Sequence, residues 1–129
     1  MEDSPARQQA LANLREIVKI IRAVHAAIDD QQREAALTRL YEHPLSVEVR
    51  GDWHAPNEEQ GKAAEFRILL GTGGPAVRIR GQLDGNGEPK DAHIEYQDWF
   101  TPWEPLTDTT DAEDEALHAY CCNLPCADY

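Results

Sequence analysis

The first part of the chain carries a helical pattern of apolar positions. Apolar residues recur every three or four places over residues 11–28, which aligns them on one face of a helix. These positions are Leu11, Leu14, Ile17, Val18, Ile21, Val24 and Ile28. Ser4 and Pro5 precede the pattern, and a capping serine followed by proline is typical of a helix start. The pattern predicts a long amphipathic helix that begins near Pro5.

A second, shorter helix is predicted to follow the first. Asp29 and Asp30 interrupt the apolar pattern, and aspartate is a preferred residue at the start of a helix. The apolar positions of this helix are Ala36, Leu37, Leu40 and Tyr41. Pro44 ends it, because the residue before a proline is disfavoured in the helical conformation.

From Leu45 onward the apolar period shortens to two, which is the period of a half-buried strand. Four such segments follow, with inward positions Leu45, Val47 and Val49; Phe66, Ile68 and Leu70; Val77, Ile79 and Leu83; and Ala92, Ile94 and Tyr96. Glycine-rich turns at 71–75 and 84–87 separate the last three, and Gly81 is a candidate β-bulge. Short connections between consecutive strands predict an antiparallel meander.

The last predicted element is a short helix after Thr110 and Asp111. Leu117, Tyr120 and Leu124 have helical spacing, and acidic residues fill the first turn, where the helix dipole favours them. The sequence thus predicts an α+β fold: a four-stranded antiparallel meander packed on N-terminal helices, with a short acidic C-terminal helix. We expect one domain over residues 1–129, with a helical part at 1–43, the sheet at 45–99 and an acidic C-terminal segment at 104–129.

Charge is distributed unevenly along the chain. The 24 Asp and Glu residues outnumber the 12 Lys and Arg, which gives a formal net charge of −12. All 12 basic residues lie within residues 1–90, whereas residues 91–129 contain ten carboxylates and no Lys or Arg. Such a field repels nucleic acid and attracts basic protein surfaces. We therefore expect a positively charged protein partner and no direct contact with nucleic acid; the alternative is that the charge serves only solubility.

Cysteine usage and hydropathy bear on the compartment. The three cysteines lie within the last nine residues, and an odd, clustered set is a poor disulfide framework. No apolar run approaches the roughly 18 residues that a membrane-spanning helix needs, and the acidic start of the chain differs from a signal peptide. We expect a cytoplasmic protein that is neither membrane-embedded nor exported.

Two sets of residues are candidates for metal binding or acid/base chemistry. His118, Cys121, Cys122 and Cys126 are weak zinc candidates, because one imidazole and three thiols would complete a tetrahedral site. Free thiols are the alternative, since the paired spacing of zinc sites is missing, and we expect no cofactor. Asp52, His54 and His93 would form an acid/base group if their strands ended close together. No recognised nucleophile accompanies them, so the sequence predicts a non-enzyme.

Charged and aromatic side chains supply the candidate binding residues. Arg67, Arg78 and Arg80 are predicted to form cross-strand pairs with Glu48, Glu65 and Glu95 on the outward sheet face. Trp99, Phe100 and Trp103 fall within five residues, and such aromatics either pack in a core or anchor an interface. The predicted partner-binding residues are Asp98, Trp99, Trp103, Glu104, Asp108, Asp111, Glu113, Asp114 and Glu115.

One stretch of the sequence resembles a known family. It covers just under half of the chain and consists of Pro44-Leu45-Ser46-Val47, Arg50, Asp52-Trp53-His54, Ile68-Leu69-Leu70, Gly73-Gly74-Pro75-Ala76-Val77-Arg78-Ile79, Gly87-Glu88-Pro89 and Glu95-Tyr96-Gln97-Asp98-Trp99-Phe100-Thr101-Pro102-Trp103. It resembles small, mostly hypothetical proteins that bacteriophages and prophages encode. The cysteine-rich end departs from the pattern of that family.

The resemblance implies a role inside a bacterial host, although the family brings no established activity. Small acidic phage proteins often inhibit host defence complexes whose nucleic-acid-binding grooves are basic. Together with the charge, this predicts an anti-CRISPR or anti-restriction inhibitor that occludes a basic groove by acidic mimicry. The alternatives are a structural or regulatory phage protein that forms a homo-oligomer, such as a homodimer, and a small zinc-binding module.

Overall fold

The fold is known from a computed structural model, which describes residues 4–51, 53–58 and 63–125. Three helices and a five-stranded sheet follow one another as α1 (Pro5–Ala26), α2 (Asp30–Glu42), β1 (Ser46–Gly51), β2 (Ala63–Gly71), β3 (Ala76–Gln82), β4 (His93–Gln97), β5 (Glu104–Pro105) and α3 (Asp111–Cys122). Each strand pairs antiparallel with the next, in the order β1-β2-β3-β4-β5. The predicted α+β class and meander are confirmed, with one strand more than the sequence indicated.

The fifth strand was missed because its sequence carries no strand signal. It comprises only Glu104 and Pro105, which lie opposite Tyr96 and Glu95 of β4. Proline lacks a backbone N–H and is tolerated in a sheet chiefly at an edge, which is where β5 lies. The pairing is therefore a product of tertiary structure, and part of the segment expected to be an acidic tail belongs to the sheet.

Side-chain caps begin all three helices, and those at Ser4 and Asp29 were predicted from the sequence. The Ser4 hydroxyl accepts a hydrogen bond from the Arg7 amide at 3.1 Å, and the Asp29 carboxylate accepts one from Gln32 at 2.8 Å. Thr110 begins α3 with a full capping box. These bonds satisfy backbone N–H groups that have no partner within the helix, which is why the starts are fixed locally.

Three predicted core positions are exposed instead, and one of them is Leu45, which precedes β1 and is 59% exposed. Ile28 is 86% exposed, because α1 already ends at Ala26 and Asp29 starts a new helix. Tyr41, in the last turn of α2, also lies in solvent. The buried residues of α2 are Ala36 and Leu40, so this helix packs against the rest of the protein through a narrow apolar stripe.

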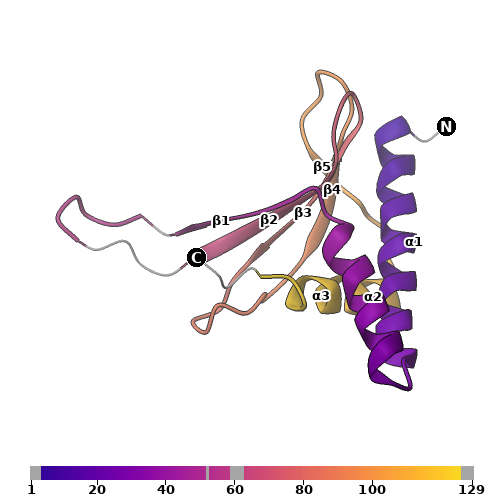
Figure 1. Cartoon of the computed structure of the whole chain (residues 1–129). Helices are drawn as coiled ribbons and strands as arrows, with labels where there is room; N and C mark the ends of the chain where they lie inside the picture. Colours follow the sequence, from indigo (N-terminus) through magenta and orange to yellow (C-terminus); the bar gives the residue numbers. More distant parts are fainter. Residues whose placement is uncertain (1–3, 52, 59–62, 126–129) are drawn as a thin grey trace.

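The helices cover one face of the sheet and leave the other open (Figure 1). Ile68, Ile79 and Ile94 are register partners on β2, β3 and β4, and all three are buried in one core with residues of α1, α2 and α3. No charged side chain of the described residues is buried. The charged positions of the strands face the other way, which sets a polar surface opposite the helices.

Gly81 pairs in register with Phe66, so the predicted bulge at this glycine is wrong. The register shifts lie at Arg50/Gly51 and at Leu69/Gly71. A Cβ atom at Gly81 would come within 2.6 Å of the Phe66 ring and 2.2 Å of the Asp91 carbonyl oxygen. Glycine is needed there because the aromatic ring and a neighbouring backbone approach closely.

Candidate functional site

The loop between β4 and β5 exposes two aromatic rings at one end of the sheet. Trp99 is 67% exposed and Phe100 is 99% exposed, and their ring centroids lie 5.9 Å apart. Most large apolar side chains of the described residues are buried instead in the core. We call this loop, residues 98–103, together with the β2–β3 turn at 72–75, the aromatic end.

A compact turn holds the two rings outward. The Thr101 amide and hydroxyl both donate to the Asp98 carbonyl oxygen, and the Gln97 side chain donates to the Thr101 carbonyl oxygen at 2.8 Å. Phe100 has a φ of 60°, in the left-handed region that non-glycine residues rarely adopt. A bulky residue in this conformation costs on the order of 1–3 kcal/mol, and the cost persists only where surrounding contacts impose it.

The β2–β3 turn supplies the surface on which Trp99 rests. A Cβ atom at Gly74 would lie 2.0 Å from Nε1 of Trp99, so the indole is in direct contact with the glycine backbone. Gly73 and Gly74 both have positive φ, with values of 98° and 47°. The two loops thus meet at the upper end of the molecule, where Figure 1 shows them side by side.

Trp103 fastens the far side of the loop to the open face of the sheet. The guanidinium of Arg78 lies 3.9 Å from the centroid of the Trp103 ring, a cation–π contact. Nε of Arg78 also donates to Glu95 at 2.8 Å, and the arginine side chain is only 15% exposed. Trp103 is therefore half-buried by an arginine rather than free to anchor a partner.

Asp98 joins the aromatic end to the first helix. Its carboxylate accepts a hydrogen bond from the Ala6 amide at 3.1 Å, in the first turn of α1. This amide is one of those that a helix leaves without an internal partner. Asp98, predicted to bind a partner, therefore has an internal structural contact.

Three of the predicted acidic residues lie in or beside the capping box of α3. Glu113 accepts a bond from the Thr110 amide at 2.9 Å, and Asp114 accepts one from the Thr109 hydroxyl at 2.7 Å. Asp111 also lies in the first turn. The carboxylates thus stabilise a helix start, while Asp108 and Glu115 are exposed and Glu104 lies in β5 beside the Tyr96 hydroxyl.

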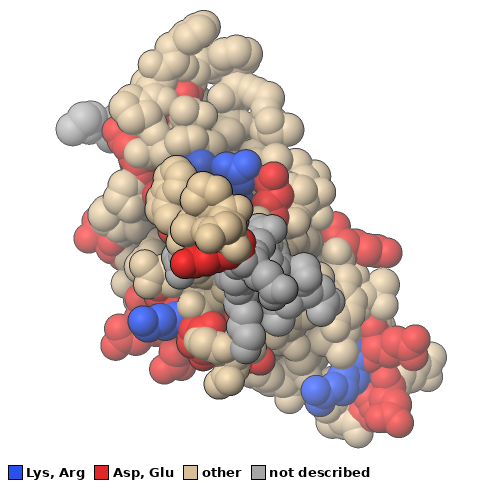
Figure 2. All heavy atoms as spheres, turned by 90° about the vertical axis from the view of Figure 1, so that its left-hand side faces the viewer, with Lys and Arg blue, Asp and Glu red and all other residues tan. Residues whose placement is uncertain are grey.

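The structure does not bring the nine predicted residues together. The start of α3 shares a pocket with Arg22 and His25 of α1, whereas Asp98 contacts Ala6 near the other end of that helix. At 1.5 Å per residue, Ala6 and Arg22 are about 24 Å apart along the helix. Figure 2 shows red carboxylate side chains spread over the visible face, while the upper end is drawn almost entirely in tan. The acidity forms a general field rather than one patch.

The weak zinc candidates divide between two environments. His118 and Cys122 lie one turn apart, with 3.7 Å between Nε2 and Sγ, but the same Nε2 atom lies 2.8 Å from the Pro89 carbonyl oxygen. Cys121 is buried in the core, and Cys126 lies outside the described residues. Within residues 4–51, 53–58 and 63–125, no three metal-ligating side chains gather.

The acid/base candidates are also apart. Nδ1 of His54, which follows β1, lies 3.0 Å from the carbonyl oxygen of the neighbouring Ala55, whereas His93 begins β4 and its Nε2 lies 3.7 Å from the Asp91 carboxylate. β2 and β3 separate these two strands, which at about 4.8 Å per strand spacing is about 14 Å. Asp52 lies outside the described residues.

The open face of the sheet carries the predicted ion pairs, with one difference. Arg67 pairs with Glu48 at 2.8 Å and Arg78 with Glu95 at 2.8 Å, as expected. Glu65 instead makes its close contact with Arg50, a residue outside the predicted pairs, and lies 4.0 Å from Arg80. Hydrogen bonding to Arg67 lowers the pKa of Glu48, and hydrogen bonding to Arg50 lowers the pKa of Glu65.

The predicted binding set omitted three exposed aromatic residues of the described part of the chain, Tyr41, Trp53 and Phe100, and of these only Phe100 lies at the aromatic end. Its neighbours Trp99 and Trp103 were included, but the positive φ that turns Phe100 outward has no signal in the surrounding sequence. The nearest usable hint was the glycine pair at 73–74, because such residues permit a close approach by another segment.

Comparisons with known proteins assign neither a family nor a function to the chain. No family model matches the chain, and neither a curated protein nor a solved structure is significantly similar to it. In the described part of the chain, no helix has both the length and the apolar character needed to cross a bilayer. The reading of function therefore depends on the aromatic end, the charge and the open sheet face.

Proposed function

We propose that this chain is a non-catalytic protein that docks on a basic protein surface through its aromatic end. The observation that carries the proposal is Phe100, which is fully in solvent at a strained positive φ beside the exposed ring of Trp99. Exposed aromatic rings held in place by a rigid loop are typical anchors of protein interfaces. The strain supports a role for the loop, because residues in strained backbone conformations concentrate at functional sites.

Charge supports the choice of partner. A net charge of −12 attracts positively charged surfaces over a distance of about 10 Å at moderate salt and raises the rate of encounter. Because the carboxylates are spread over the molecule and several cap helices, we propose that they steer the encounter while the rings provide the contact. This differs from groove mimicry by a continuous acidic surface, which would need the carboxylates in one place.

The biological role that fits such a binder is inhibition of a host defence complex. The phage family that the sequence resembles and the affinity of an acidic protein for basic grooves both support an anti-CRISPR or anti-restriction role. In this proposal the protein acts in the host cytoplasm and prevents nucleic acid from reaching a nuclease. A homodimer formed through the aromatic end is the competing outcome.

The test compares the protein with two single variants, Phe100→Ala at the aromatic end and Tyr41→Ala on α2. Both remove an exposed ring, so Tyr41→Ala controls for loss of surface aromatic area. Purified CRISPR nucleases and restriction enzymes are assayed for DNA binding and cleavage at low and high salt. We expect inhibition by the wild type and by Tyr41→Ala, weakened by salt and by Phe100→Ala.

Two results would contradict the proposal. One is equal inhibition by both variants, which would remove the aromatic end from the interface. The other is a homodimer in light scattering that dissociates in Phe100→Ala while no nuclease is inhibited, because the rings would then serve self-association. Loss of folding in a variant is excluded by circular dichroism before either comparison.

A further inference from the structure

Three arginines lie side by side on the open face of the sheet. Arg67 of β2 and Arg80 of β3 are direct register partners, and Arg78 lies two residues from Arg80 on the same face. Like charges directly opposite each other across two strands are destabilising. In a chain with twice as many acidic as basic residues, this arrangement is unexpected for a surface that only has to be solvated.

The neighbouring carboxylates do not compensate all of these charges. Glu48 is held by Nε of Arg67, Glu95 by Nε of Arg78, and Glu65 makes its close contact with Arg50. Arg80 is left with an ion pair of 4.0 Å to Glu65, too long for a hydrogen bond. Arg67 is bonded to Glu48 through Nε, so this bond does not use its terminal amino groups, whereas the guanidinium of Arg78 is covered by the Trp103 ring.

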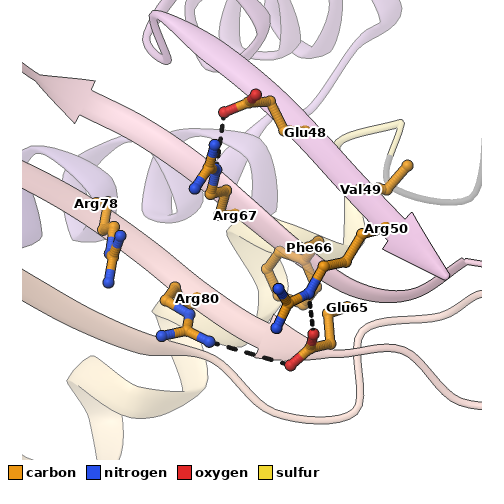
Figure 3. Close-up of a pocket in the computed structure, with 8 residues that line it drawn as sticks. All are labelled: Glu48, Val49, Arg50, Glu65, Phe66, Arg67, Arg78 and Arg80. Atoms are coloured by element: carbon orange, nitrogen blue, oxygen red, sulfur yellow. Dashed lines mark hydrogen bonds and ion pairs between the residues drawn. The ribbon is translucent and has the colours of Figure 1, made fainter. Parts of the chain in front are cut away.

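These side chains enclose an open pocket of about 320 Å³ (Figure 3). Four arginines and two glutamates line it, and Val49 and Phe66 complete the wall. The arginines still outnumber the carboxylates when Glu95, the partner of Arg78, is added to the two lining glutamates. The volume is at the lower end of the range for small-molecule sites, which is roughly 300–1,000 Å³.

We propose that this pocket binds the phosphate group of a small phosphorylated molecule. Guanidinium groups match phosphate oxygens through paired N–H donors, and Arg80 with the terminal amino groups of Arg67 supplies such donors from two adjacent strands. A long polyanion is disfavoured, because the net charge of −12 would repel every phosphate outside the pocket. The ligand is therefore a compact anion rather than nucleic acid.

The test uses inorganic phosphate as the probe. The protein is titrated at low salt, with the Nε–Hε signals of the arginines followed by NMR and sodium chloride at matched ionic strength as the reference. We expect phosphate to shift the signals of Arg67 and Arg80 in a saturable way, with no shift of Arg39. A short single-stranded oligonucleotide is expected to bind more weakly than phosphate.

Two matched variants locate the site. Arg80→Gln removes the arginine with the longest ion pair, and Arg39→Gln removes an exposed arginine of α2 that pairs with Glu16. Loss of one charged hydrogen-bonding partner should weaken phosphate binding about 10-fold to 100-fold in Arg80→Gln and leave Arg39→Gln unchanged. Arg67→Gln serves as a second test if Arg80→Gln does not fold.

The outcomes are distinct. Shifts that sodium chloride reproduces, equal weakening in Arg39→Gln, or preference for the oligonucleotide would each overturn the pocket as a phosphate site. The inference does not depend on the aromatic end, so Phe100→Ala should bind phosphate as the wild type does. Failure of nuclease inhibition and failure of phosphate binding can therefore be told apart.

Discussion

The contact between Trp99 and Gly74 can be tested by adding a single methyl group. In Gly74→Ala the new Cβ would lie 2.0 Å from Nε1 of Trp99 and 2.8 Å from Cζ2. Carbon atoms in ordinary contact are about 3.5–4.0 Å apart, so the ring must withdraw by about 1.5 Å. The ring lies at the far end of a side chain, and we expect it to move rather than to force the backbone apart.

Gly73→Ala is the matched control for this variant. Gly73 also has a positive φ, but no atom lies within 4 Å of a Cβ placed there. Both variants should lose about 1–2 kcal/mol, because an L-residue in the left-handed region is strained. Only Gly74→Ala should displace the indole of Trp99.

The assay follows the indole N–H signals of the three tryptophans by NMR, alongside thermal unfolding. We expect the Trp99 signal to shift in Gly74→Ala and to keep its position in Gly73→Ala, while Trp53 is unaffected in both. If Trp99 moves equally in the two variants, or in neither, the close contact with Gly74 does not exist. Nuclease inhibition by Gly74→Ala should fall with the displacement of Trp99.

Two further predictions concern stability. Gly81→Ala should destabilise the protein by about 1–3 kcal/mol, since its Cβ meets the Phe66 ring and a fixed carbonyl oxygen. Gly85→Ala is the control: no atom lies within 4 Å of a Cβ placed at Gly85, so this variant should unfold in urea as the wild type does. If Gly81→Ala also unfolds as the wild type does, the close packing around Gly81 is contradicted. Burial is the main cause that lowers the pKa of His43 below 6.5, so the unfolded chain takes up the proton first. Stability should be complete above pH 6.5 and fall as the pH drops from there toward the folded pKa, and His43→Asn should flatten that slope in urea titrations.

Local features of the fold were predictable, and features made by distant segments were not. The three helix starts were predictable because the capping bonds of Ser4, Asp29 and Thr110 each reach a residue three positions further along the chain. Alternation placed the four longer strands because one side of each packs against the core, fully buried in β2, β3 and β4 and partly buried at Val47 and Val49 of β1. Periodicity failed at Ile28, because it does not indicate where a helix ends in space.

The candidate sites show the same division. Residue types revealed the acidic residues and the aromatic cluster, but not that Asp98 would cap α1 or that Trp99 would rest on Gly74, a residue 25 positions away. The phosphate pocket depends on strand register, which places Arg67 opposite Arg80. A shift of one residue would have turned one of them to the opposite face.

The hydrogen bond from the Ala6 amide to Asp98 couples the first turn of α1 to the loop that carries Trp99 and Phe100. Backbone amides exchange with solvent when the structure around them opens, so the exchange rate at Ala6 should report the state of a loop far away in sequence. Docking at that loop would slow deuterium uptake at the start of α1, although no residue of the helix touches the partner. Deuterium uptake at the start of the amino-terminal helix would therefore report whether a partner is bound at the loop.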